Sequence, residues 1–328
     1  MKIKNEEYKE KETTQNFKVE EEIDTHHPHD SFFKKAFGDL ELSKNFLKNN
    51  LPEELIKIID FETLDNQDVC FIDEKLKNTF SDLLYKVNIN KSEGYIYILY
   101  EHKSYVTKKA ILQLLKYIIK IWEHKTTKEK LPIIIPILIY HGKNKWNIST
   151  KLSDYIEEIP EPIKKYIPDY EYEIYDLSPK SGIEITGNLL LKSIIEILKS
   201  IKTENKKTFI ESYIKICDLL EKNEITEKEK TIMWFKIIIF YILSIRDDIT
   251  PNELIEIQKQ RGEEIMSIAD KIKLEGKLEG KIEGKLEEKI ETAKKMIKAN
   301  LTTTQISHFT GLTIKEIHQL EKQLKNNQ

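Results

Sequence analysis

The stretch GYIYILYEHKSYVTKKAILQLLKYIIKIWEHK, residues 94–125, begins as a strand and ends as a helix. Its opening run of tyrosine, isoleucine and leucine is typical of a buried strand. From residue 107 to 124 apolar side chains recur at helical spacing on one broad face, which predicts an amphipathic helix. Glu101-His102-Lys103 stands at the junction. A charged triplet at the end of an apolar strand indicates a functional position at the edge of a sheet.

The segments around this stretch predict a mixed α/β sheet with helices on its faces. Short apolar runs broken by turn residues fill residues 57–103, among them DVCFID (68–73), and the turn NKSEG (90–94) joins the last two into a hairpin. LPIIIPILIYHG (131–142) is apolar throughout, as expected of a strand covered on both sides. A helix-start signal at Pro28 precedes apolar residues at helical spacing and predicts one helix there. The order helix, strands, helix, strand is that of an α/β fold.

The remainder of the chain predicts a mostly helical C-terminal region. Prolines between residues 160 and 179 mark a loop-rich connector. Helices are predicted at 151–159, 188–202, 206–222, 228–246 and 251–270. The predicted organisation is a flexible tail at 1–27, an α/β core at 28–150, a helical region at 151–270, a repeat helix at 271–291 and a helix-turn-helix-like hairpin at 292–328.

The repeat KLEGKLEGKIEGKLEEKIE (273–291) places lysines in one row and glutamates in another. Like charges four residues apart repel within one helix, so a second copy could lay its acidic row on this basic row. Three interior glycines each cost about 1 kcal/mol against alanine. Self-association into a homo-oligomer and a solvated, semi-flexible spacer are both compatible with this pattern.

The hairpin near the C-terminus has serine or threonine before each helix start and Gly311 between the helices. These are the ingredients of a helix-turn-helix, but a plain helical hairpin has the same spacing. DNA contact and packing against a partner remain alternatives for it.

Composition limits the class of protein. The chain has 328 residues, of which 39% are hydrophobic and 33% charged, with a formal net charge of −3. Such a charge gives no global attraction to nucleic acid, so DNA contact would need a local basic face. Cys70 and Cys217 lie far apart in the sequence and predict buried thiols of a reducing compartment. The N-terminus lacks an apolar signal segment and Lys236 interrupts the most apolar helix, so we expect a cytoplasmic protein without a membrane partner.

Two carboxylates and a lysine meet at the end of the predicted hairpin. Glu101 and Lys103 are two residues apart on a strand and therefore point to one face. If the hairpin pairs around residues 90–94, Asp82 in FSDLLYKV comes close to Glu101. Two carboxylates in one site repel, and a divalent cation relieves them. Oxygen ligands suit Mg²⁺, and a neighbouring lysine can activate water or neutralise charge on phosphorus.

Gln113 and Tyr117 lie one turn apart on the following helix, where they could complete the pocket. Each part also has an ordinary explanation. An aspartate next to a serine at a strand start is commonly a turn or cap residue, and Glu-x-Lys at a strand end is commonly a surface ion pair. The combination of Asp82, Glu101-x-Lys103 and the two helix residues favours a site.

This arrangement resembles the PD-(D/E)XK nuclease superfamily, and within it the Rpn family of recombination-promoting nucleases, also known as the YhgA-like transposase group. The likeness runs from about residue 26 and is strongest through 146. The segments that carry it are PHDSFFKKAFGD (28–39), FSDLLYKV (80–87), YILYEHKSY (97–105), QLLKYIIKIWE (113–123) and PILIYHGKNKW (136–146), followed by the Glu-Gly-Lys repeat.

The resemblance implies a nuclease core over 28–150 and Mg²⁺-dependent DNA cleavage. It implies that Asp82 and Glu101 bind the metal, that Lys103 is the catalytic lysine, and that Gln113 with Tyr117 forms the family's helix motif. Ser81 stands where the name-giving proline would precede Asp82.

The resemblance does not assign roles to Asp30 or to the nearby histidines. His29 and Asp30 lie at the start of the first helix, where they could contribute to the site. Gly142 is expected to serve turn geometry, and the role of His141 is left open. A literal transposase of the three-acid type would need a third carboxylate and a different core.

The preferred function is a metal-dependent DNA endonuclease that uses Mg²⁺ or another divalent cation, with a role in recombination resting on the family resemblance alone. The alternative is a catalytically inactive nuclease-like module that binds DNA or a protein. A purely oligomeric helical adaptor would explain the repeat but not the spacing of Asp82, Glu101 and Lys103.

Overall fold

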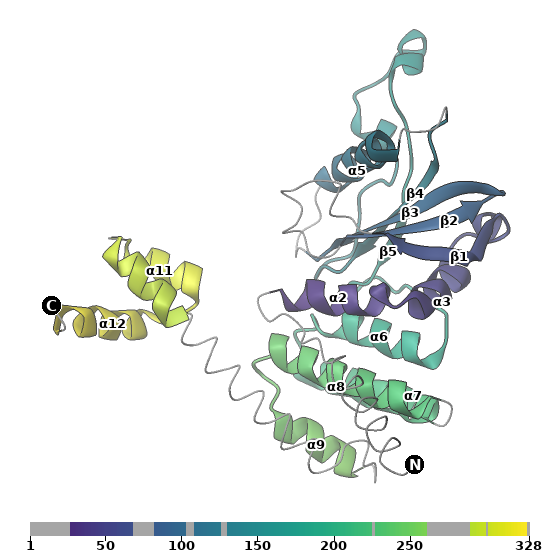
Figure 1. Cartoon of the computed structure of the whole chain (residues 1–328). Helices are drawn as coiled ribbons and strands as arrows, with labels where there is room; N and C mark the ends of the chain where they lie inside the picture. The colour runs from purple at the N-terminus through teal and green to yellow at the C-terminus, as the bar shows by residue number, and fades with distance from the viewer. Residues whose placement is uncertain are drawn as a thin grey trace, which may run out of the picture. The chain divides into compact units, whose positions relative to one another are not determined.

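The computed structural model describes residues 27–67, 82–102, 108–125, 130–224, 227–260, 289–299 and 301–326 (Figure 1). The chain divides into two compact units, residues 1–261 and 262–328. Several predicted features fall wholly or largely outside the described residues: the tail at 1–27 except for residue 27, the strand at 68–73, Lys103, the second half of the helix at 251–270 and most of the repeat at 271–291.

The first unit is built on a five-stranded mixed sheet in the order β1-β2-β3-β4-β5. The first three strands pair antiparallel, and β3-β4 and β4-β5 pair parallel. The strands are β1 (Ile59–Gln67), β2 (Leu83–Ile89), β3 (Ser92–Glu101), β4 (Ile133–Tyr140) and β5 (Glu173–Asp176). With the helices on its faces, this sheet confirms the predicted mixed α/β fold.

A two-residue turn fixes the hairpin of β2 and β3. Ile89 pairs with Ser92, so the turn is Asn90-Lys91, shorter than the predicted NKSEG. Both turn residues have positive φ, 48° and 64°, as a type I′ hairpin turn requires. The turn therefore sets the register that carries Leu84 opposite Tyr97.

Helix α5 (Lys109–Lys125) covers one face of the sheet and connects the parallel strands β3 and β4 (Figure 1). Its apolar stripe packs on Leu84, Tyr97 and Leu138 in one buried cluster. The apolar face that the helical spacing predicted is therefore the face of α5 that packs in the core.

Helices α2 (Pro28–Gly38) and α3 (Leu40–Asn50) lie against the opposite face. The Phe33 ring stacks on Tyr100 of β3 at 3.9 Å between centroids. The sequence predicted one helix here, which is wrong. The chain breaks at Asp39, whose carboxylate accepts from the backbone N–H groups of Glu41 and Leu42 and caps a new helix.

Behind α2 and α3, helices from the second half of the first unit form a further layer (Figure 1). Phe32 of α2, for example, stacks on Tyr241 of α8 at 4.1 Å. The helices are α6 (Leu189–Ser200), α7 (Lys206–Glu224), α8 (Lys228–Ile245) and α9 (Pro251–Gln260), with the short α4 (Glu53–Ile56) earlier in the chain. The predicted helical C-terminal region is confirmed.

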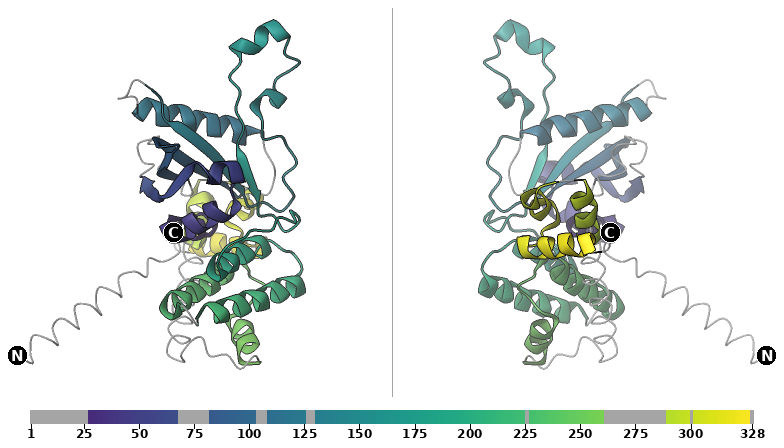
Figure 2. Two further views of the ribbon diagram at one scale, coloured as in Figure 1. Left: turned by 90° about the vertical axis from the view of Figure 1, so that its right-hand side faces the viewer. Right: turned by 90° about the vertical axis from the view of Figure 1, so that its left-hand side faces the viewer.

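The connector between β4 and β5 differs from its prediction. A helix was expected at 151–159, but the structure has a single 3-10 turn, η3 (Leu152–Tyr155), followed by η4 (Glu161–Tyr166). Pro160 and Pro162 interrupt this region, and a proline in a helix interior removes a backbone donor. Figure 2 shows the η4 segment projecting away from the sheet. Strand β5 has four residues and was not predicted.

The second unit contains helical residues 289–298, α11 (Thr303–Thr310) and α12 (Ile314–Asn326). Thr302 and Gln305 form a reciprocal capping box, and Gly311 ends α11 in the left-handed conformation at φ 68°. The two helices of the predicted hairpin are therefore present. A small apolar core joins the three segments: Ala293, Ile306, Leu312, Ile317 and Leu320.

None of the helices in the described part of the chain is long and apolar enough to cross a bilayer.

Candidate active site

The hairpin register brings Asp82 and Glu101 to one end and one face of the sheet. Asp82 directly precedes β2, two residues before Leu84, which pairs with Tyr97. Glu101 ends β3 beside Tyr140 of β4. Leu84, Tyr97 and Tyr140 all belong to the cluster under α5. Because strand side chains alternate, both carboxylates face the α5 side, where each is 6% exposed.

Two tyrosines surround Asp82. The Tyr97 hydroxyl donates to Asp82 Oδ2 at 2.8 Å, and Tyr117 of α5 is a second side-chain hydrogen-bond partner. Burial raises the pKa of Asp82 to about 6. The two hydrogen bonds oppose this rise, while the charges of Asp30 and Glu101 add to it. Asp82 is thus a carboxyl group held in a negative, poorly solvated position.

Helix α5 supplies Tyr117, and Gln113 lies one turn before it. The Tyr117 ring packs against Tyr97 at 4.8 Å, and Gln113 Nε2 lies 3.4 Å from Tyr117 Oη. Tyr117 therefore reaches Asp82 directly, whereas Gln113 is partly exposed and contacts Tyr117. Lys103 lies outside the described residues, so its position relative to these groups remains a prediction.

The start of α2 brings further polar groups to the end of β3. Asp30 is 6% exposed, and its Oδ1 lies 3.2 Å from His102 Nδ1. His29 Nδ1 is hydrogen-bonded to the hydroxyl oxygen of Tyr241 in α8, at 2.7 Å. Burial, followed by the charges of Lys202 and His102, lowers the pKa of His29 to about 3, so this ring is neutral.

His141 follows β4 and is fully buried. Burial holds the pKa of His141 well below its usual range. Its Nε2 donates to Leu198 O at 2.7 Å, and its Nδ1 accepts from the Tyr100 hydroxyl at 2.6 Å. With both ring nitrogens engaged, His141 joins the sheet to α6 and has a structural role.

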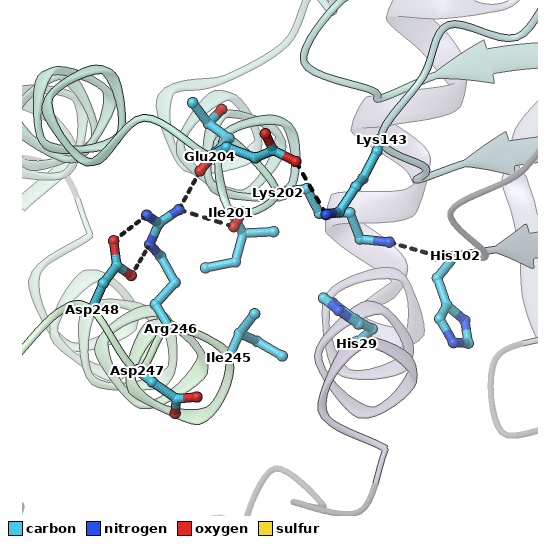
Figure 3. Close-up of a pocket in the computed structure, with 11 residues that line it drawn as sticks. His29, His102, Lys143, Ile201, Lys202, Glu204, Ile245, Arg246, Asp247 and Asp248 are labelled. Carbon is cyan, nitrogen blue, oxygen red and sulfur yellow. Dashed lines mark hydrogen bonds and ion pairs between the residues drawn. The ribbon is translucent and has the colours of Figure 1, made fainter. Parts of the chain in front are cut away.

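A cavity of about 730 Å³ lies beside His102 (Figure 3). It is formed where the start of α2, the ends of β3 and β4, and the carboxyl ends of α6 and α8 meet. Its lining mixes histidines, cations and acids: His29, His102, Lys143, Ile201, Lys202, Thr203, Glu204, Ile245, Arg246, Asp247 and Asp248.

The donor set at this end of the sheet suits a hard divalent cation. The buried carboxylates of Asp82 and Glu101 offer oxygen, and their mutual repulsion is what a cation would relieve. Within the described ranges, no group of three or more His, Cys, Asp or Glu has the geometry to hold a metal. Mg²⁺ is usually held by one or two carboxylates with waters, so two ligands fit Mg²⁺ and do not fit a structural zinc site.

Two groups near the site were not predicted. Tyr97 has the pattern of any buried strand residue, and its bond to Asp82 depends on the hairpin register. Lys202 follows an apolar helix, where the sequence alone indicates only a solvent-exposed lysine. Its ammonium nevertheless contacts the backbone at the ends of β3 and β4. Asp30, by contrast, was noted from the segment PHD at the helix start.

Comparison with known proteins decides the family. A family model described as "Putative transposase, YhgA-like" matches residues 27–231. The chain belongs to this family. It is 24% identical over 297 residues to recombination-promoting nuclease RpnA of Escherichia coli (strain K12), covering 88% of this chain and 96% of that one. It is 25% identical to recombination-promoting nuclease RpnD of Escherichia coli O157:H7, covering 75% of this chain and 94% of that one.

The match to these relatives confirms the predicted membership of the Rpn family, within the PD-(D/E)XK superfamily. Other relatives carry a different description. The inactive recombination-promoting nuclease-like protein RpnE of Escherichia coli (strain K12) is 33% identical over 124 residues, which cover 37% of this chain and 42% of that one. No solved structure matches the chain. The family is therefore one of nucleases that also has members described as inactive.

Proposed function

We propose that this protein is a divalent-cation-dependent DNA endonuclease that hydrolyses phosphodiester bonds. The observation that carries the proposal is the pair of buried carboxylates, Asp82 and Glu101, at the end of the hairpin. The relatives described as recombination-promoting nucleases support DNA as substrate and a role in recombination.

In this proposal Asp82 and Glu101 hold Mg²⁺ or a similar cation. The bound cation would polarise the scissile phosphate and activate water. Lys103 would orient the attacking water or neutralise the charge that develops on phosphorus. Tyr117 and Tyr97 would hold the Asp82 carboxylate in place through their hydroxyl groups, with Gln113 supporting Tyr117.

The inactive nuclease-like module is the second candidate, because the relative RpnE is described as inactive. This chain has Asp82, Glu101 and Lys103 together, which favours the active alternative. A DNA-binding module could use the lysine for a phosphate contact but would have no need of two buried carboxylates at one end of the sheet.

Plasmid cleavage tests the proposal. We expect the full-length protein to nick supercoiled plasmid in the presence of Mg²⁺ or Mn²⁺. Addition of EDTA should abolish this cleavage. Asp82→Ala, Glu101→Gln and Lys103→Ala should each lower the rate at least about a hundredfold, because each removes a metal ligand or a charge acting on the transition state. The far-UV circular dichroism should be unchanged.

Asp65→Ala is the matched control, since Asp65 is an exposed aspartate on the neighbouring strand β1. It should cleave like the wild type. Equal cleavage by wild type and by all three site variants would remove the active-site assignment, and absence of cleavage by the wild type with either metal would favour the inactive module.

A further inference from the structure

Lys202 connects the helical layer to the end of the sheet. Its ammonium donates to the backbone carbonyl of His102 at 2.5 Å and to that of His141 at 2.6 Å. Figure 3 shows the lysine reaching from the end of α6 toward His102. One side chain thus contacts the two residues that directly follow the parallel strands β3 and β4.

The bridged carbonyls lie where the parallel ladder stops. Glu101 pairs with Tyr140, and the His141 N–H donates to Glu101 O at 2.8 Å. The carbonyls of His102 and His141 come after this last ladder bond. A buried carbonyl without a donor is costly, and a charged donor gives a stronger bond than a neutral one.

The carbonyl of His102 belongs to the peptide group that joins His102 to Lys103. A peptide group is planar and rigid, so holding its oxygen fixes the plane of the peptide group that follows the His102 Cα. Glu101 lies on the other side of the same residue. Lys202 therefore acts on the residue directly after Glu101, the proposed metal ligand.

Lys202 is itself held from both sides. The Arg246 guanidinium donates to Thr203 O at 2.6 Å and to Ile201 O at 3.3 Å, the carbonyls that flank Lys202 in sequence. Arg246 is 8% exposed and is fixed in turn by a paired contact with Asp248. The chain of contacts runs from α8 through the end of α6 to the end of β3.

The charge around Lys202 agrees with this placement. Burial lowers the pKa of Lys202 to about 8, and the charges of Glu101 and Asp30 oppose the lowering. The ammonium and the Glu101 carboxylate therefore interact across the end of the sheet. Lys143 lines the same cavity but pairs with Glu204, at 3.3 Å, on the exposed side.

We propose that Lys202 is a positioning residue of the nuclease site: its ammonium clamps the carbonyls of His102 and His141 and so fixes Glu101, which directly precedes His102, for cleavage. This inference rests on the proposed function for its catalytic consequence. The clamp itself concerns the backbone at the ends of β3 and β4, at His102 and His141, and can be measured without cleavage.

Two measurements on full-length protein test the clamp, with Lys202→Met, Lys202→Arg and the control Lys143→Met. The first is hydrogen exchange, followed by mass spectrometry, of peptides spanning residues 99–107. The second is DNA cleavage, resolved into kcat and KM. Lys202→Met should exchange faster in these peptides and lose about tenfold to a hundredfold in kcat, with KM within twofold, because small misplacements of catalytic groups have effects of that size.

Lys202→Arg keeps donors for the two carbonyls and should recover most of both properties. Lys143→Met removes a cation from the same cavity without touching the strand ends, and should match the wild type in both. If Lys202→Met loses the folded far-UV spectrum, Lys202→Gln, whose shorter and uncharged side chain does not bridge both carbonyls, takes its place with the same expectations.

Unchanged exchange at residues 99–107 in Lys202→Met would overturn the clamp. So would a rise in KM shared equally by Lys202→Met and Lys143→Met with kcat unchanged, because that result indicates general attraction of DNA. Should the wild type fail to cleave, the proposed function fails, while the exchange measurement still decides whether Lys202 orders this segment.

Discussion

Asp82 is a carboxyl group that the fold holds in an unfavourable environment. The pKa of Asp82 is raised to about 6, chiefly by burial and to a smaller extent by the nearby charges of Asp30 and Glu101, against the hydrogen bonds from Tyr97 and Tyr117. An aspartate retained in such a place costs stability at neutral pH. Strongly shifted carboxyl groups of this kind are characteristic of functional sites.

The shift has a definite sign for stability. Because the pKa of Asp82 in the folded protein lies above its unfolded value, its contribution is most favourable at low pH and is lost as the pH rises toward and through about 6. In EDTA at pH 8, Asp82→Asn should therefore raise the free energy of unfolding by on the order of 2 kcal/mol. At pH 5 the gain should be roughly half as large, because Asp82 is then largely protonated in the folded protein but still ionised in the unfolded chain, and it should vanish only below the unfolded pKa of 3.8.

Urea denaturation at the two pH values measures this effect, with Asp65→Asn as the control. Asp65 is exposed on β1, and its substitution should leave the unfolding midpoint unchanged at both pH values. An Asp82→Asn variant that is less stable than the wild type at pH 8 would show that the carboxylate is well stabilised, contrary to this description.

At the scale of single elements, the two-residue turn of the β2-β3 hairpin determines where the site residues fall. A slip of one residue would move Asp82 to the opposite face, because strand side chains alternate. Lys91 adopts φ 64°, which suits glycine better than a residue with a Cβ. The turn therefore sets the register that the site needs, although Lys91 is a less favourable residue than glycine in its left-handed conformation.

Lys91→Gly should stabilise the protein by about 0.5 to 1 kcal/mol, because it relieves the left-handed conformation at a position where type I′ turns prefer glycine. Ser92→Gly, one residue later in β3, gains no such relief and should destabilise instead. Chemical denaturation of both variants provides the test. Loss of stability in Lys91→Gly would mean that the lysine side chain has a role beyond the turn.

Elements with strong local patterns could be predicted from the sequence, and short or interrupted ones could not. The apolar run that ends at Glu101 and the apolar stripe of α5 each indicate a buried element from the local sequence alone, and both lie in the core. Strand β5 has four residues, and its pairing with β4 is a non-local contact that no local pattern records. The break between α2 and α3 depends on one capping aspartate, Asp39, inside a continuous helical rhythm.

The site shows the same division. Asp82, Glu101 and Lys103 could be proposed because residue type, strand period and hairpin order agree. Lys202 could not, since its contact with His102 joins positions 100 residues apart. No sequence pattern marks a lysine whose function is to hold backbone carbonyls.

At the scale of the whole molecule, the charge is divided unevenly. The chain has a formal net charge of −3, whereas residues 289–326 contain seven lysines and three glutamates. A local excess of lysine in a helix-turn-helix-like unit is compatible with DNA contact, and packing against a partner remains the alternative. Self-association through the repeat at 271–291 likewise stays a prediction, as does a cytoplasmic location.

The candidate site is assembled from distant parts of the chain: the start of α2, the hairpin of β2 and β3, the helix α5 and the end of α6. Family membership extends over residues 27–231, which includes all of these elements. In the proposed function, this assembly places Asp82 and Glu101 where a single divalent cation would bind both.

Anomalous X-ray diffraction from crystals of the full-length protein grown with Mn²⁺ is the most direct measurement. We expect a manganese peak within ligand distance, about 2.0 to 2.6 Å, of carboxylate oxygens of both Asp82 and Glu101. The peak should disappear in Asp82→Asn crystals that retain the fold. A metal bound elsewhere, with these two carboxylates turned apart, would show that Asp82 and Glu101 do not form one metal site.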